Sequence, residues 1–121
     1  MAKLAIIAHG GAGANPRKKS NVEKAIQQGS SLLESDACAV DAAVEACVIL
    51  ENDPAFNAGT GSVTRLDGSV LVDASIHVTD GRLGFVASMP ETPNPIRVAE
   101  ALLDEDINGL GGIGAREWAD Q

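Results

Sequence analysis

The chain has 121 residues and carries 17 acidic against 9 basic side chains, a formal net charge of −8. Its length allows one domain with a core of its own, and its acidity argues against nucleic acid as a partner. Because aromatic residues make up only 2% of the chain, the core must consist mainly of Ala, Val, Ile and Leu, which favours a closely layered α+β architecture.

Neither a membrane span nor a signal peptide is predicted. No apolar run approaches the roughly 18 residues that a bilayer requires, and no cleavage pattern follows the short apolar run near the N-terminus. Cys38 and Cys47 lie on one predicted helix, on opposite sides and about 13 Å apart along its axis, so they cannot form a disulfide with each other. Free cysteines are typical of the reducing cytoplasm, where we expect this protein to act.

The first half of the chain predicts one strand and two helices. Residues 3–9 form a nearly continuous apolar run, typical of a buried strand, and a glycine-rich loop follows them. We expect a helix from a cap at Ser20 or Asn21 to about Glu34, and a second helix over residues 37–51, capped by Asp36. The second helix is apolar almost all round, which predicts burial on more than one side.

The second half predicts three strands and two helices. Asp67-Gly68 is a strong hairpin signal between expected strands at residues 62–66 and 69–76, and another strand is expected at residues 83–89. Asn94 is the predicted cap, and Pro95 the first residue, of a helix that ends near Glu105. The glycine-rich residues 109–114 interrupt regular secondary structure before a last helix, which is expected at 113–120. This order favours a sheet with helices stacked on its outer face.

The loop around Asn57 is the strongest candidate for function. Gly59 and Gly61 allow tight bending close to other groups, and such shaped loops often bind or catalyse. A self-cleaving bond before Thr60 would cut a helix–strand connection in a small domain, so Thr60 is interpreted as an ordinary loop residue. The glycine loop at residues 9–13 lacks the spacing of a dinucleotide-binding or P-loop motif, and His9 is interpreted as a structural, hydrogen-bonded residue. The basic run at residues 17–19 is interpreted as solvated.

Five motifs follow one another in a familiar order: HGGAG at residues 9–13, VDAAV at 40–44, LENDPAFNAGTGS at 50–62, DASI at 73–76 and NPI at 94–96. Together they resemble the plant-type L-asparaginase/isoaspartyl peptidase family of N-terminal-nucleophile hydrolases, over the whole chain. Glycosylasparaginases, which share the layout, are the nearer rival. The resemblance implies half of a four-layer αββα sandwich, with residues 1–121 forming a single domain of the α-subunit.

The resemblance also implies what the chain lacks. Family members are made as precursors that cut themselves before a threonine, and this threonine begins the β-chain and acts as the nucleophile. The expected enzyme hydrolyses L-asparagine, β-aspartyl dipeptides or both, through an acyl-threonine intermediate. The chain alone would be inactive, and the expected assembly is an (αβ)₂ heterotetramer without membrane or nucleic-acid partners.

Several residues match family positions with known roles. Asn57 matches an asparagine beside the nucleophile, and Gly10 and Gly11 match a glycine strip linked to self-cleavage. A loop that binds an alkali cation, usually sodium, is matched by six residues through their main-chain carbonyls: Leu50, Glu51, Asp53, Phe56, Ala58 and Thr60. No organic cofactor is implied. In the segment from Ile76 to Gly81 the chain departs from the family, with two extra residues and no Met.

A non-catalytic module is the competing interpretation. Such a fragment would bind an ion or a small anion through residues 57–61, or through the backbone N–H groups of residues 10–13. A chain that is folded, monomeric and stable without a partner would favour this interpretation.

Overall fold

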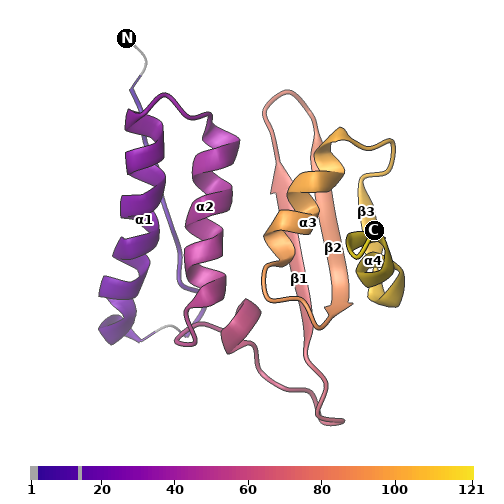
Figure 1. Cartoon of the computed structure of the whole chain (residues 1–121). Helices are drawn as coiled ribbons and strands as arrows, with labels where there is room; N and C mark the ends of the chain where they lie inside the picture. Colours follow the sequence, from indigo (N-terminus) through magenta and orange to yellow (C-terminus); the bar gives the residue numbers. More distant parts are fainter. Residues whose placement is uncertain (1–2, 14) are drawn as a thin grey trace.

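The structure, a computed structural model, describes residues 3–13 and 15–121. A helical hairpin stands beside a small sheet that carries further helices (Figure 1). The elements in chain order are η1 (Pro16–Lys18), α1 (Lys19–Glu34), α2 (Ala39–Asn52), η2 (Gly59–Gly61), β1 (Leu71–His77), β2 (Leu83–Pro90), α3 (Pro95–Ala101), η3 (Leu102–Asp104), β3 (Gly109–Gly111) and α4 (Gly112–Ala119).

Gly29 allows α1 to pack closely on α2. A Cβ at Gly29 would lie 3.2 Å from the carbonyl oxygen of Ala42 and 3.6 Å from the Cβ of Ala46. On its other side α2 contributes Val44 and Val48 to a cluster with Ile96 of α3. The predicted burial of α2 on more than one side is therefore confirmed.

Two of the three predicted helix caps were wrong. Before α1, the side chain of Asn15 accepts the N–H of Arg17 at 2.9 Å and begins η1, so neither Ser20 nor Asn21 starts a helix. Before α2, the cap is Cys38, whose Sγ accepts the N–H of Asp41 at 3.5 Å. Asp36 instead has φ +66° in the tight turn between the helices, a left-handed conformation that Asp tolerates better than most residues.

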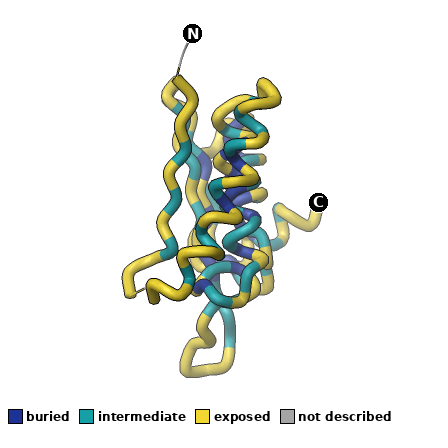
Figure 2. Tube along the Cα trace, turned by 90° about the vertical axis from the view of Figure 1, so that its left-hand side faces the viewer, coloured by how far each residue is buried: buried dark blue, intermediate teal, exposed yellow. Residues whose placement is uncertain are grey.

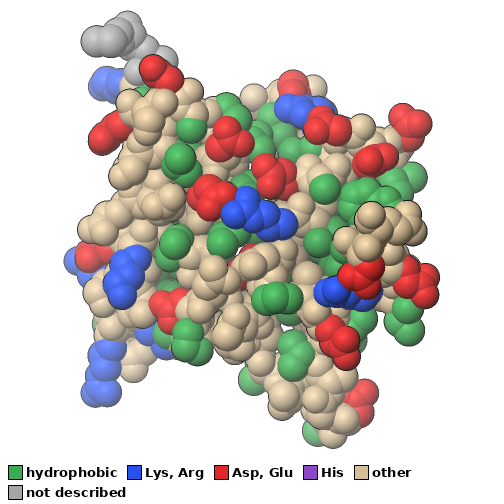
Figure 3. Space-filling view, viewed as in Figure 1, with side chains coloured by type: hydrophobic (Ala, Val, Ile, Leu, Met, Phe, Trp, Pro, Cys, Tyr) green, Lys and Arg blue, Asp and Glu red, His purple; other side chains and the backbone are tan. Residues whose placement is uncertain are grey.

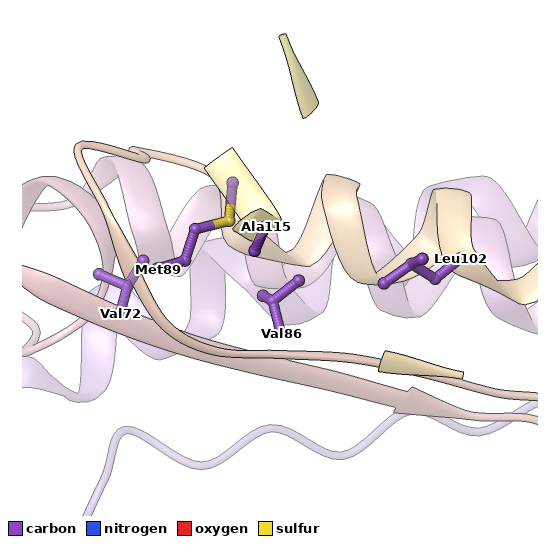
Figure 4. Packing of buried hydrophobic residues seen from close by; sticks show 5 residues of the cluster. All are labelled: Val72, Val86, Met89, Leu102 and Ala115. Atoms are coloured by element: carbon purple, nitrogen blue, oxygen red, sulfur yellow. The ribbon is translucent and has the colours of Figure 1, made fainter. Parts of the chain in front are cut away.

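The sheet has the order β1-β2-β3, with β1 antiparallel and β3 parallel to β2. Its buried face packs against α3, η3 and α4, and Figure 4 shows the core there: Val72, Val86, Met89, Leu102 and Ala115. The expected helices on a sheet are thus present on one face, whereas α1 and α2 lie beside the sheet. The short β3 lies in the segment that was predicted only as a break.

Residues 3–9 are not a strand, contrary to the prediction. They run extended behind the helical hairpin, and no described strand pairs with them (Figures 1 and 2). Ile6 reaches Gly29 of α1, but Leu4 is 61% and Ile7 is 95% exposed. An apolar run becomes a strand only when another strand takes up its N–H and C=O groups, and the described residues provide none.

The first arm of the predicted hairpin is also absent. Residues 62–66 are irregular, although the turn itself forms: Arg65 N–H donates to the Ser69 carbonyl at 2.8 Å and Gly68 has φ +83°. The hairpin that does form joins β1 to β2, and its turn holds Thr79 and Asp80. The segment that departs from the family, Ile76 to Gly81, therefore forms the end of β1 and this turn.

None of the helices in the described ranges has the length and apolar character needed to cross a bilayer. On the face seen in Figure 3, acidic and basic side chains are interspersed, without a continuous basic patch.

Candidate functional site

The loop from α2 to β1 owes its shape to two glycines. A Cβ at Gly59 would lie 2.6 Å from the carbonyl oxygen of Glu51, and Gly59 also has φ +49°. A Cβ at Gly61 would lie 2.1 Å from the carbonyl oxygen of Phe56 and 2.7 Å from that of Pro54. Backbone carbonyls therefore turn toward this stretch and leave no room for a side chain, as the sequence predicted for a shaped loop.

Asn57 lies on this loop between two hollows. Its side chain is exposed, and its Oδ1 accepts the N–H of Val63 at 2.9 Å, which fixes the carboxamide against the following segment. One hollow, of about 380 Å³, is also lined by Arg65 and Asp73. The other, of about 370 Å³, opens toward the N-terminal glycine loop.

The structure brings Gly10 and Gly11 to the hollow that Asn57 also lines. Gly11 has φ +97°, which favours glycine, and its N–H donates to Nδ1 of His9 at 2.9 Å. His9 therefore supports the local turn, in agreement with its interpretation as a structural residue. Residues far apart in sequence thus converge on Asn57.

Lys18 is the residue at this site that sequence reasoning missed. Its neighbours Arg17 and Lys19 are exposed, as expected, but the Lys18 ammonium donates to the carbonyl of Ala55 and lies 5.8 Å from the ring centroid of Phe56. The available signal was sequence spacing, because Lys18, the N-cap residue of α1, lies three positions before Asn21 and so on the same side of the helix.

Asp53 completes the contact between α1 and the loop. Its Oδ2 accepts Asn21 Nδ2 at 2.7 Å and its Oδ1 accepts the N–H of Ala55 at 2.9 Å. The hydrogen bonds from Ala55 and, next, from Asn21 lower the pKa of this carboxyl. Asp53 is therefore ionised near neutral pH and fixes the loop as an acceptor.

Glu51 joins the loop to α3. Its side chain is only 6% exposed, and its carboxylate accepts the N–H of Ile96 at 3.0 Å and Asn94 Nδ2 at 3.1 Å. Burial raises the pKa of Glu51, against the opposing effect of these two hydrogen bonds and of Arg97. Asn94 is the N-cap residue of α3, as predicted, but its side chain donates to Glu51 and Asn52, and the Glu51 carboxylate accepts the helix N–H in its place.

The carbonyls that were expected to hold an alkali cation lie at the end of α2 and on this loop. Leu50, Asp53 and Ala58 each accept one backbone N–H, which leaves each oxygen a second lone pair. The carbonyls of Glu51 and Phe56 point into the space that a Cβ at Gly59 or Gly61 would fill. Within residues 3–13 and 15–121 no group of three or more His, Cys, Asp or Glu side chains is placed to hold a metal ion. Any cation here would therefore depend on backbone oxygens, which suit alkali ions better than transition metals.

Comparison with known proteins identifies the family. The Asparaginase family profile matches residues 2–121. The chain belongs to this family. Its relatives include an isoaspartyl peptidase/L-asparaginase of Rattus norvegicus, 36% identical over 96% of this chain and 37% of its own length. A plant-type L-asparaginase of Pyrococcus abyssi is 40% identical over 96% of this chain and 40% of its own length. The resemblance seen in the motifs is thereby confirmed.

The chain spans about two-fifths of the length of these relatives. Both relatives carry the names of enzymes that hydrolyse amide bonds.

Proposed function

We propose that this chain is the α-subunit of a Thr-dependent amidohydrolase that acts on L-asparagine, β-aspartyl dipeptides or both. The observation that carries the proposal is family membership combined with coverage of only about two-fifths of the relatives' length. The β-chain, produced by autoproteolysis, supplies an N-terminal Thr, and two αβ units assemble.

In this reaction the β-chain Thr Oγ attacks the side-chain amide carbon of the substrate, and the Thr α-amine accepts the hydroxyl proton. A β-aspartyl ester forms as ammonia or an amino acid leaves with that proton. Water then hydrolyses the ester and regenerates the Thr. The contribution of this chain is Asn57, whose carboxamide polarises the site and holds a water.

The threonines of this chain support a nucleophile supplied from outside. Thr60, Thr64 and Thr79 are exposed, and Thr92 Oγ1 donates to the carbonyl of Pro90 at 2.8 Å. A nucleophilic hydroxyl needs a neighbouring base to accept its proton. None of these four hydroxyls is hydrogen-bonded to a base within the described ranges.

Unpartnered apolar surface supports a second chain. Leu4 and Ile7 are exposed on the extended N-terminal segment. Val63 (67%) and Leu66 (112%) are exposed on the segment after Asn57, where Val63 lines the same hollow as Arg65. Apolar surface that is contiguous, rather than scattered as single side chains, is typical of sites that a partner covers. In the proposed sandwich, β-chain strands would lie next to residues 3–9 and convert them into the strand that their sequence predicts.

The loop carbonyls named above would hold an alkali cation, sodium by preference, whose charge would order the loop. The two free cysteines, Cys38 and Cys47, support a cytoplasmic location, since a reducing compartment keeps thiols unpaired.

The test compares the isolated 121-residue chain with the cellular assembly that contains it. Both are assayed with L-asparagine, with a β-aspartyl dipeptide and with the matching α-aspartyl dipeptide as a control. We expect the assembly to hydrolyse at least one of the first two substrates and to leave the α-linked dipeptide intact. Turnover by the isolated chain would contradict the division between subunits, and an assembly without amidase activity would contradict the function.

A further inference from the structure

A contact from the start of α1 holds the outer side of the Asn57 loop. Lys18 and Asn21, here called the α1 clamp, reach the loop on two of its residues: the Lys18 ammonium binds the carbonyl of Ala55, and the Asn21 carboxamide binds Asp53. The residues contacted lie only two to four positions before Asn57. Any movement of the loop away from α1 must break both contacts.

The Lys18 ammonium has a preorganised environment. It lies 5.8 Å from the ring centroid of Phe56, a residue only 4% exposed, so the cation also faces the aromatic ring. The ionised Asp53 is part of the same loop and is favoured by the charge of Lys18. A carbonyl and an aromatic ring thus contact one positive charge, and an ionised carboxylate lies on the same loop.

Lys18 and the proposed alkali cation are both positive charges that would bind the backbone of the same loop. The candidate cation ligands Asp53 and Phe56 flank Ala55 on both sides in the sequence, so the two positive charges would hold the same short stretch of backbone. A covalently attached ammonium is always present, whereas an alkali ion is held weakly and exchanges with solvent.

We propose that Lys18 is a positioning residue that holds the loop from the α1 side and keeps Asn57 in place whether or not an alkali cation is bound. The inference rests on the proposed function for the importance of Asn57, but the hold on the loop itself is testable without activity. It would make the order of this site largely independent of sodium.

The experiment measures amide hydrogen exchange in residues 55–63 of the assembly, in sodium chloride and in tetramethylammonium chloride of equal ionic strength. The variants are Lys18→Met, which removes the charge but keeps an apolar stem over Phe56, and Lys18→Arg, which keeps the charge. Lys19→Met is the matched control, since the Lys19 side chain is 81% exposed. Amides of α3 serve as an internal reference for global unfolding.

In the wild type and in Lys18→Arg we expect exchange to differ less than about twofold between the two salts. Lys18→Met should exchange about tenfold faster or more in tetramethylammonium, with partial recovery in sodium, while Lys19→Met behaves like the wild type. If Lys18→Met does not fold, Lys18→Gln takes its place with the same expectation.

Protection in Lys18→Met equal to that of the wild type would overturn the proposal, as would a wild-type loop that loses its protection when sodium is removed. Fast exchange of Lys18→Met in both salts would uphold the role of Lys18 and count against the alkali-cation site. Failure of the proposed function would show instead as absent hydrolysis by the wild-type assembly. The exchange measurement and the activity assay therefore distinguish failure of the Lys18 proposal from failure of the proposed function.

Discussion

The Glu51 carboxylate, at the end of α2, accepts the backbone N–H of Ile96 in the first turn of α3 at 3.0 Å. The same residue's main-chain carbonyl faces Gly59. One buried residue therefore links the helical hairpin, the sheet-covering helix and the loop that carries Asn57.

Replacing Glu51 by Ala should destabilise the fold by about 1–3 kcal/mol, because the Ile96 N–H and the Asn94 carboxamide lose a buried acceptor. The free energy of unfolding from urea titration measures the effect. Glu45→Ala is the control: it removes a partly exposed partner of Arg97 at 2.6 Å and should cost only about 0–1 kcal/mol. Equal losses in the two variants would contradict the capping role.

The raised pKa of Glu51 predicts a defined dependence of stability on pH. Because the folded state holds this proton more tightly than the unfolded chain, Glu51 contributes stability that is fully present below its ordinary pKa of 4.5 and lost as pH rises through the higher folded value. Subtracting the unfolding free energy of Glu51→Gln from that of the wild type isolates this contribution from other carboxylates. The difference should fall as pH rises from that ordinary value toward neutrality; a rising difference would show that the sign is wrong.

Gly61→Ala should destabilise the fold by about 1–3 kcal/mol or more, since its Cβ would lie 2.1 Å from the carbonyl oxygen of Phe56. Gly114→Ala in α4 is the matched control, because a Cβ there has open space. It should be neutral or stabilising by up to about 1 kcal/mol, as Ala favours helix over Gly. Thermal unfolding of both variants measures the contrast, and similar melting temperatures would contradict the account of the loop.

Asn57→Ala should lower the turnover rate of the assembly by tenfold or more, on the order expected when a polar group is removed from a reacting site. Its stability should change by less than about 1 kcal/mol, because the side chain is exposed and water can replace it at the Val63 N–H. Rates and unfolding curves of the same preparation separate the two effects. A large loss of stability with unchanged turnover would assign Asn57 a structural role instead.

Local patterns predicted much of the fold. The nearly all-apolar helix α2, the turn at Asp67-Gly68 and the start of α3 at Pro95 follow from nearest neighbours in the sequence, and each is present. The cap position of α3 at Asn94 was predicted, but the side chain that accepts the first-turn N–H was not, because it comes from Glu51, more than forty positions earlier. Such a contact has no local signal.

The prediction of a strand at residues 3–9 was wrong for a different reason. The composition of these residues is that of a strand, but pairing depends on a neighbour that the described residues do not supply. At the candidate site, the glycines and Asn57 were visible as a shaped loop, whereas Lys18 looked like one of three solvated basic residues. Only the fold places it against Ala55.

The most direct test of the two-chain account is the intact mass, under denaturing conditions, of everything that purifies with this chain. The account predicts a second polypeptide whose N-terminal residue is Thr. A single folded species of 12.4 kDa that hydrolyses L-asparagine by itself would contradict it.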